Sequence, residues 1–373
     1  MNKIQKVTVS GLAGLLATAT LAACGSSSDS SDGATDSATK TDFLPCMVSD
    51  AGGFDDHSFN ELGYDGLKKA AEELGSDERH VESSADTDYA PNIDNLVSEG
   101  CDLIITVGFN LASATKDAAK ANPDVKFVLI DDAADGGDDG NTYDGKADQP
   151  NIKPLLYNTA QAAFLAGYAS ASYSKAGIVG TYGGMNFPTV SIFMDGFAQG
   201  VDYYNAQKGK TVKVVGWDEE KQDGAFTGGF EANNKATQTA QQIIDQGADV
   251  ILPVGGPIYQ GALTVIKNNP DKGIVMLGVD ADVFETDPTT DDYILTSVEK
   301  KIDTGVYSVV KDAAENPDSF DFTPYIGTLE NDGVGIAPFH NYEDKVDSGL
   351  ADELDTIKAG IIDGSIPVKS YLD

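Results

Sequence analysis

Residues 49–60, with the sequence SDAGGFDDHSFN, place glycines, three aspartates and Phe59 on what reads as a turn between a strand and a helix. Ionised carboxylates accept hydrogen bonds but donate none, so they suit ligands rich in hydroxyl or amino groups and repel phosphates and carboxylates. Phe59 offers a flat apolar face to a planar ring or to the apolar side of a sugar. These residues together favour a neutral ligand with a flat part and several hydroxyl groups, and a nucleoside fits that description.

Similar groups follow the other expected strands. They are GFN at 108–110, Asp131 with Asp132, GGMNFP at 183–188, GWDEE at 216–220, VGGPIYQG at 254–261, and Asp280 with Asp282. Parallel doubly wound sheets bind ligands outside the carboxyl ends of their strands, and glycines there let backbone approach a ligand. Lys300, in TSVEKK, is a lone cation that can hold a ligand hydroxyl or ring nitrogen, or pair with Asp280.

Structural roles compete with binding roles at several of these positions. Glycines after strands are common turn devices, and Phe59 could simply pack its helix against the core. Asp55 and Asp56 stand just before a helix, and for this pair helix capping is the favoured interpretation. For Asp131 and Asp132, a ligand contact and a purely structural role in the loop are weighed equally.

The elements that must position these residues alternate along the chain. The first round of strands is expected at 43–49, 79–85, 102–108 and 126–132, with helices at 59–74, 90–99 and 112–122. A second round has strands at 176–184, 211–217, 249–256, 273–282 and the start of 293–313, with helices at 158–174, 193–204, 232–246 and 258–268. The tail carries a strand near 333–338 and a helix near 350–362. This alternation predicts an α/β fold of two doubly wound parallel-sheet lobes, with the break near 149–156.

The N-terminal residues carry the pattern of an exported protein. A basic start, a short apolar run from Val7 to Ala22 and small residues before Cys24 predict a signal peptide over 1–23. The sequence LAAC resembles a bacterial lipobox, which implies lipidation of Cys24. Residues 24–42 then read as a flexible tether, because they hold almost nothing apolar to bury. The net charge of −35 argues against nucleic acid and against direct adhesion to anionic lipid.

Enzymatic and metal chemistry find little support. The chain has no GxSxG, phosphate-binding loop, HExxH or CxxC motif, and its three histidines are scattered, so no metal or cofactor is expected. A calcium loop starting at Asp135 fails at its twelfth position, which is Lys146. A carboxylate-based nucleosidase remains an alternative. A disulfide between Cys46 and Cys101 is not favoured, because the two cysteines are offset along neighbouring strands if the strand order is 2-1-3.

The residues also resemble a known family. The stretches SDAGGFDDHSFNELGYDGL, YASASYSKAGIVGTYGGMNFPTVSIFMDGFAQGVDYYN, QQIIDQGADVILPVGG, GVDAD and ILTSVEKKID are similar to the basic membrane protein family, also called PnrA-like purine nucleoside receptors. These proteins are substrate-binding components of ABC importers. The resemblance implies a fold like the type I periplasmic binding proteins, whose two lobes close on a nucleoside.

Residue by residue, the resemblance implies roles for eight positions. Phe59 would stack on the base, with Phe193 on its opposite face, or Phe187 or Trp217 in that place. Asp50, Asn60 and Asp131 would make polar contacts, Asp131 with the base. The ribose would be held by Gly255, Asp280 and Lys300. The turn GGPIYQG and the Asp/Gly-rich insertion after Asp131 depart from the family's pattern and leave the base preference open.

The sequence therefore predicts a lipid-anchored substrate-binding protein at the outer face of the cell membrane. It would capture nucleosides, purines above all, and deliver them to the permease and ATPase subunits of an importer. The binding domain is expected over 43–373, with lobe 1 at about 43–155 plus 280–325 and lobe 2 at about 156–279 plus part of the tail. The alternatives are a sugar or signalling-furanose receptor on the same scaffold, and a surface receptor or adhesin without import.

Overall fold

The computed structural model describes residues 42–137 and 145–372, and these described residues belong to one compact unit. The expected signal peptide, Cys24 and the tether up to residue 41 lie outside the described residues. The middle of the Asp/Gly-rich loop, at 138–144, does so as well.

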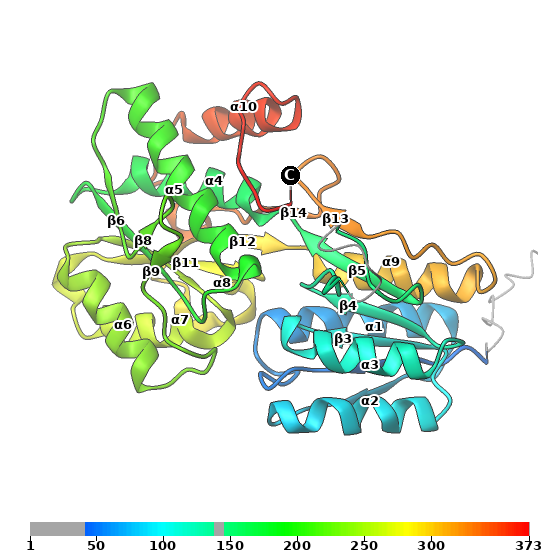
Figure 1. Ribbon diagram of the computed structural model, residues 1–373. Coiled ribbons are helices and arrows are strands. Elements are labelled where there is room, and N and C mark those ends of the chain that lie inside the picture. The colour runs from blue at the N-terminus through cyan, green and yellow to red at the C-terminus, as the bar shows by residue number, and fades with distance from the viewer. Residues whose placement is uncertain (1–41, 138–144, 373) are drawn as a thin grey trace, which may run out of the picture. The chain divides into compact units, whose positions relative to one another are not determined.

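Two parallel-dominated sheets organise the described residues, each with helices on both faces (Figure 1). The first sheet has the order β13-β5-β4-β3-β1-β2, with every pair parallel. Its strands are β1 (Pro45–Val48), β2 (Arg79–Val81), β3 (Leu103–Val107), β4 (Lys126–Ile130), β5 (Ile152–Tyr157) and β13 (Tyr325–Gly327). Its first three strands have the 2-1-3 order that the expectation for Cys46 and Cys101 assumed.

The second sheet repeats this plan with the order β14-β12-β11-β10-β6-β7. Its strands are β6 (Ile178–Gly183), β7 (Lys213–Val215), β10 (Val250–Val254), β11 (Val275–Asp280), β12 (Ile294–Lys300) and β14 (Val334–Ile336). Only β14 runs antiparallel to its neighbour among these strands. A two-stranded ribbon of β8 (Trp217–Asp218) and β9 (Asp223–Gly224) follows β7. The expected α/β class with two parallel-sheet lobes is confirmed.

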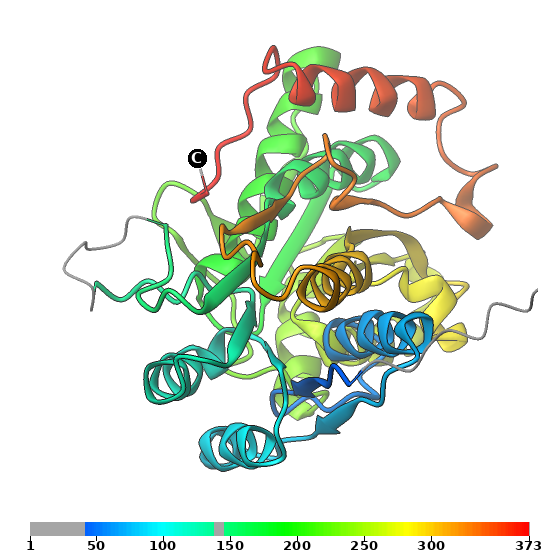
Figure 2. The ribbon, with the colours of Figure 1, turned by 90° about the vertical axis from the view of Figure 1, so that its right-hand side faces the viewer.

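Buried residues alternate between the two faces of each strand, which explains the helical cover on both sides. In the first sheet, Cys46 and Val48 pack with α2 and α3, whereas Met47 faces α1. Figures 1 and 2 show α9 beside α1 although more than two hundred residues separate them in sequence. The helices are α1 (Phe59–Leu74), α2 (Tyr89–Ser98), α3 (Ala112–Ala121), α4 (Thr159–Tyr173), α5 (Pro188–Lys208), α6 (Asn234–Asp245), α7 (Tyr259–Lys267), α8 (Val283–Thr286), α9 (Ile302–Glu315) and α10 (Leu350–Ile362).

Glycines set the packing of α4 against α5 in the second lobe. A Cβ atom on Gly200 would overlap the carbonyl oxygen of Phe164, and one on Gly196 would overlap that of Ala160. Gly167 meets the backbone of Phe197 in the same way. The two helices are therefore in backbone contact, and this contact fixes the position of α5, which carries Phe193.

Two sequence expectations about the lobes need correction. The segment expected to be the break between the lobes is instead β5, an inner strand of the first sheet with Pro154 in its middle. Residues 280–300 were expected in the first lobe, but β12 pairs with β11 in the second sheet, and only α9 and β13 return to the first. A run of hydrophobic residues predicts that a strand is present but does not say which sheet the strand joins. The sequence therefore could not show that the chain returns to the first lobe only after β12.

Within residues 42–137 and 145–372, three segments pass between the lobes. They follow β5 at Tyr157, β12 at Lys300 and β13 at Gly327, because each of these strands is succeeded by an element of the other lobe. Chain connections of this kind form the hinge of a two-lobed fold.

The structure also overturns the expectation for Cys46 and Cys101, which form a disulfide with a Cα–Cα distance of 6.0 Å. Cys46 lies opposite Ile104 in the ladder, so the offset along the strands is real. Cys101, however, belongs to the turn after α2, where Gly100 takes a positive φ of 82° and the Cys101 amide donates to the carbonyl of Leu96. This turn carries Cys101 onto the face of the sheet that Cys46 occupies, and the two pack in one cluster.

Candidate functional site

A cavity of about 460 Å³ lies at the carboxyl ends of strands from both sheets. Its size falls within the range of sites for small molecules, about 300–1,000 Å³. All eight residues expected to bind ligand line it: Asp50, Phe59, Asn60, Asp131, Phe193, Gly255, Asp280 and Lys300. These positions, which the family resemblance implied, are spread over 250 positions of sequence.

Lys300, the last residue of β12, is the centre of the polar part of this cavity. Its side chain is only 3% exposed, and its ammonium group forms ion pairs with Asp131 of the first lobe and, at 3.7 Å, with Asp280 of the second. The rings of Phe59 and Phe193 lie 5.2 and 5.1 Å from the same nitrogen. The predicted pairing with Asp280 is confirmed, and the Asp131 contact adds a link between the lobes.

Asp131 and Asp280 occupy equivalent places in the two sheets. Asp131 directly follows β4 and Asp280 ends β11, and both have a left-handed backbone, with φ of 66° and 68°. Residues other than glycine take this conformation infrequently, aspartate more readily than most. Burial raises the pKa of both carboxyl groups, that of Asp280 to about 6, and the Lys300 ammonium opposes the rise.

A second polar cluster lies at the end of β1. The Asn60 amide nitrogen donates to Asp50 Oδ1 and to Asp56 Oδ2, each at 2.9 Å, and the Gly52 amide donates to Asp50 Oδ1 at 2.8 Å. Burial raises the pKa of Asp50 to about 6, and the bonds from Gly52 and Asn60 work against that rise. Gly108 lies close by with a φ of 104°, where an added Cβ would stand 3.1 Å from Asp50 Oδ2. Its lack of a side chain leaves room for this carboxylate.

Asp56 caps helix α1, as the sequence favoured. It accepts hydrogen bonds from the backbone amides of Ser58, Asn60 and Glu61 at 2.9–3.1 Å. These amides at a helix N-terminus have no partner within the helix. Asp56 also lines the cavity, so its carboxylate shapes the first turn of α1 and the cavity wall together.

The same turn contacts the second lobe directly. The Ser58 hydroxyl donates to the carbonyl oxygen of Val279 at 3.1 Å, and the Thr286 hydroxyl donates to the carbonyl oxygen of His57 at 2.8 Å. Both contacts join the start of α1 to the segment from β11 to α8. They add to the Lys300–Asp131 ion pair in holding the two lobes together around the cavity.

Sequence reasoning missed three aromatic residues of the cavity, Tyr89, Phe109 and Phe230. The ring centroids of Phe109 and Phe230 lie 5.8 Å apart across the lobes. Phe109 follows β3 in the segment GFN. The sequence analysis named this segment as a candidate but did not select Phe109 as a binding residue. Phe230 comes from a loop that follows no strand of the large sheets, so the strand-end rule could not find it. Added Cβ atoms at Gly184 and Gly255 would both overlap its ring, and the latter would lie 2.7 Å away.

The three candidates for a second stacking ring lie in different surroundings. Phe193 lines the cavity but is 2% exposed and packs in the main core beside Lys300. Phe187 lies against Phe109, with ring centroids 4.3 Å apart. Trp217 donates from Nε1 to Asp195 at 2.9 Å and lines a separate acidic groove, so the structure places it outside the cavity.

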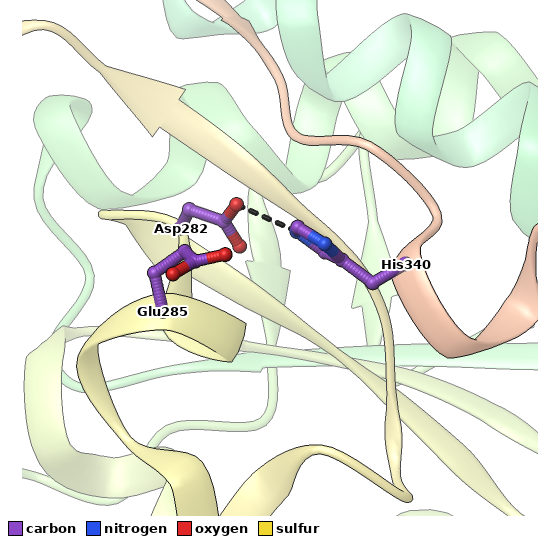
Figure 3. A group of neighbouring side chains, drawn as sticks. All are labelled: Asp282, Glu285 and His340. Atoms are coloured by element: carbon purple, nitrogen blue, oxygen red, sulfur yellow. Dashed lines mark hydrogen bonds and ion pairs between the residues drawn. The ribbon is translucent and has the colours of Figure 1, made fainter.

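The cavity's lining residues do not include a group of metal-ligand type within reach of one another. Among the described residues, such a group occurs outside the lining, where Asp282, Glu285 and His340 bring three donor atoms within 4.8 Å of each other (Figure 3).

Comparison with known proteins identifies the family of this chain. The family model described as ABC transporter substrate-binding protein PnrA-like matches residues 43–370. The chain belongs to this family. The ABC transporter nucleoside-binding protein BmpA of Lactococcus lactis subsp. cremoris (strain MG1363) is 30% identical over 387 residues, which cover 99% of each chain. An uncharacterized lipoprotein of Pyrococcus abyssi is 29% identical over 283 residues, covering 73% of this chain and 65% of the relative.

Solved structures of other proteins share this two-lobed fold. An ABC transporter solute-binding protein from Aeropyrum pernix K1 superposes with a TM-score of 0.74 at 24% identity, covering 89% of this chain and 94% of that one. Membership of the PnrA-like family makes the chain the substrate-binding component of an ABC transporter, with a small-molecule ligand and with permease and ATPase subunits as partners. In the described part of the chain, no helix combines the length and apolar character that crossing a bilayer requires.

Proposed function

We propose that this PnrA-like protein binds nucleosides, purine nucleosides above all, in the cavity between its lobes. The observation that carries the proposal is the arrangement around Lys300, where one cation and two carboxylates from opposite lobes lie beside aromatic rings. Asp131 and Asp280 can accept from ribose hydroxyls or base N–H groups, and Lys300 can donate to a hydroxyl or ring nitrogen. The acids would repel a phosphate, which favours nucleosides over nucleotides.

The aromatic residues supply the surface for the base. Phe59 is half-buried at the cavity and lies next to Gly108, so part of its ring remains open to a ligand. Phe230 is also half-buried there, whereas Phe193 is nearly fully buried. We therefore assign the second stacking surface to Phe230, and give Phe193 the role of supporting the Lys300 ammonium. Base–aromatic stacking is tolerant of base identity, so selectivity for purines would come from the polar groups at Asp50 and Asn60.

The ligand would act by shifting the balance between open and closed lobes. A ligand that contacts both Asp131 and Asp280 gains these contacts only when the lobes are closed, which favours the closed state. The permease would then recognise the closed form. Lipid attached to Cys24 would hold the protein at the extracytoplasmic face of the cell membrane, and the name of the Pyrococcus relative supports such an anchor.

Calorimetric titration of the purified protein tests the ligand class. Adenosine, guanosine, inosine, cytidine, uridine and free ribose are added in separate experiments, with the free bases as further ligands. Saturable binding of purine nucleosides, with ribose and bases much weaker, supports the proposal. Binding of ribose or another sugar as tightly as the nucleosides would favour the sugar-receptor alternative. Heat that continues without saturation, with free base released, would indicate a nucleosidase.

A further inference from the structure

We propose that Asp282, Glu285 and His340 form a binding site for a divalent metal ion of the Zn²⁺ class. In Figure 3 the carboxylates of Asp282, which caps α8, and of Glu285, which lies in α8, face the imidazole of His340, which comes from a segment distant in sequence. One donor atom of each lies within 4.8 Å of the others. This inference is separate from nucleoside binding and does not rest on it.

The donor set matches the chemistry of such an ion. One imidazole nitrogen and two carboxylate oxygens are ligands that Zn²⁺ and its neighbours accept, with water in the remaining positions. The ligand atoms of a tetrahedral Zn²⁺ site lie about 3.3 Å apart, given metal–ligand distances of about 2.0 Å. His340 Nε2 and Asp282 Oδ2 are 2.7 Å apart and would separate slightly. The Glu285 carboxylate oxygen, already within 4.8 Å of the other two ligand atoms, would move closer to complete the site.

His340 is held firmly in place for this role. Its ring is stacked on Phe284, with centroids 4.0 Å apart and planes 5° from parallel. Its short helix, His340–Tyr342, is tied to the segment before β12, because Asn341 donates to the carbonyl oxygen of Asp291 and Tyr342 to that of Asp292. A ligand fixed by packing and hydrogen bonds loses little freedom on binding a metal.

The two carboxylates of the group can bind a cation in addition to the imidazole of His340. Asp282 uses Oδ1 to accept from the Phe284 amide at 3.3 Å, which leaves Oδ2 for His340 or a metal. Among the described residues, the Glu285 carboxylate has no hydrogen-bond or ion-pair partner. An ordinary Asp–His pair would explain two of the three residues, and Glu285 is what distinguishes a metal site from such a pair.

The location links the site to the closing of the lobes. Asp282 stands two residues beyond Asp280 of the cavity, and Glu285 precedes Thr286, which bonds to His57 of the first lobe. A bound metal would stiffen the turn that carries both of these interactions.

Zinc titration of the purified full-length protein in detergent tests the proposal. The protein is prepared with a histidine-free tag and stripped with a chelator, and Zn²⁺ binding is followed by calorimetry and by the rise in melting temperature that binding causes. One Zn²⁺ per chain is expected. Glu285→Gln and His340→Ala should each weaken binding roughly tenfold or more. His80→Ala is the matched control, since His80 forms an ion pair with Glu78 at 3.2 Å in the first lobe and belongs to no such group of three ligands among the described residues, and it should leave the affinity unchanged.

Each result decides the question. No saturable zinc heat, or zinc binding that survives both Glu285→Gln and His340→Ala, would overturn the site and leave an Asp–His ion pair. Glu285 is exposed, so Glu285→Gln should fold normally and keep the test valid even if His340→Ala does not. Co²⁺ provides a second readout, because visible d–d bands that are present in the wild type and lost in Glu285→Gln report its coordination directly.

Discussion

The ammonium of Lys300 lies between Asp131 and Asp280, two aspartates that occupy matching strand ends in opposite lobes and share a left-handed backbone. One cation thus forms ion pairs with carboxylates from both halves of the cavity. Removing it would leave these acids facing each other with little solvent, and the repulsion would oppose closure of the lobes.

Lys300→Met should therefore weaken nucleoside binding strongly. Loss of one partner from a buried, hydrogen-bonded charge contact costs about 2–5 kcal/mol. Calorimetry measures the affinity. Lys301→Met is the matched control, because Lys301 is the next residue, pairs with Glu299 at 2.5 Å and does not line the cavity. Equal affinities in the two variants would remove Lys300 from the binding site.

Phe59→Ala and Phe230→Ala should each weaken binding of purine nucleosides by about 1–3 kcal/mol, the usual contribution of stacking on a base. Phe322→Ala, which alters a half-buried ring outside the cavity, should have no such effect. An unchanged affinity in Phe59→Ala would exclude this ring from stacking. If Phe230→Ala alone bound normally, the second surface would have to be assigned elsewhere.

Binding should weaken as the pH falls below about 6. The pKa values of Asp50 and Asp280 are raised to about 6 by burial, so both carboxyl groups gain protons near that pH and lose capacity to accept from the ligand. Affinity should be full above pH 7 and should fall by up to about tenfold per pH unit for each group that must ionise. Titrations from pH 5 to pH 8 measure this. A pH-independent affinity would contradict the proposed contacts.

The free protein should respond to these two groups in the opposite sense. Their folded-state pKa values lie above the unfolded value of 3.8, so the stability they contribute is full below pH 3.8 and is lost as the pH rises through 6. Asp50→Asn and Asp280→Asn remove this dependence. Melting curves of the variants and the wild type, compared at pH 5 and 7, should show a smaller change with pH in the variants.

Gly200→Ala should destabilise the second lobe, because the new methyl group would overlap the carbonyl oxygen of Phe164 and push α4 from α5. Overpacking of this kind costs about 1–3 kcal/mol or more. Chemical denaturation measures the loss. Gln207→Ala, on the exposed end of the same helix, should change stability by less than about 0.5 kcal/mol. Equal stabilities would mean that the helices separate without strain.

Replacement of both Cys46 and Cys101 by serine should lower the free energy of unfolding by about 2–4 kcal/mol, since the disulfide closes a loop with a sequence separation of 55. Denaturant titration measures this loss. Thiol counting on the denatured, unreduced wild type gives an independent check. Reactive thiols from both cysteines would contradict the bond.

The alternation of strand and helix patterns was enough to predict the fold class, and the cavity residues followed from the family resemblance together with the rule that ligands bind beyond strand ends. Asp131 follows a strand of the first sheet and Asp280 and Lys300 end strands of the second, so the strand-end rule could mark each of them without knowledge of their distances. Relationships set by tertiary packing could not be found in this way. Neither the transfer of β12 to the second sheet nor the approach of Cys101 to Cys46 leaves a local signature.

The missed residues have the same explanation. Phe230 follows no strand of a large sheet, and its ring fits where Gly184 and Gly255 leave space, a relationship between distant segments. His340 lies far along the chain from Asp282, so no motif with fixed spacing contains both. Sequence favoured capping for Asp56 because a cap acts over a few residues, and the structure agrees.

Lys300 ends β12, at one of the three places where the chain passes from one lobe to the other. The side chain that we propose contacts the ligand therefore lies at the hinge between the lobes. A rotation of the lobes would move the Lys300 ammonium relative to Asp131. A ligand that holds the ammonium in one position would therefore also hold the angle between the lobes. Ligand contact at Lys300 and the angle between the lobes should therefore change together. Substitutions at this crossing that alter the preferred angle between the lobes should change the affinity for ligand, even when the substituted residue does not contact the ligand.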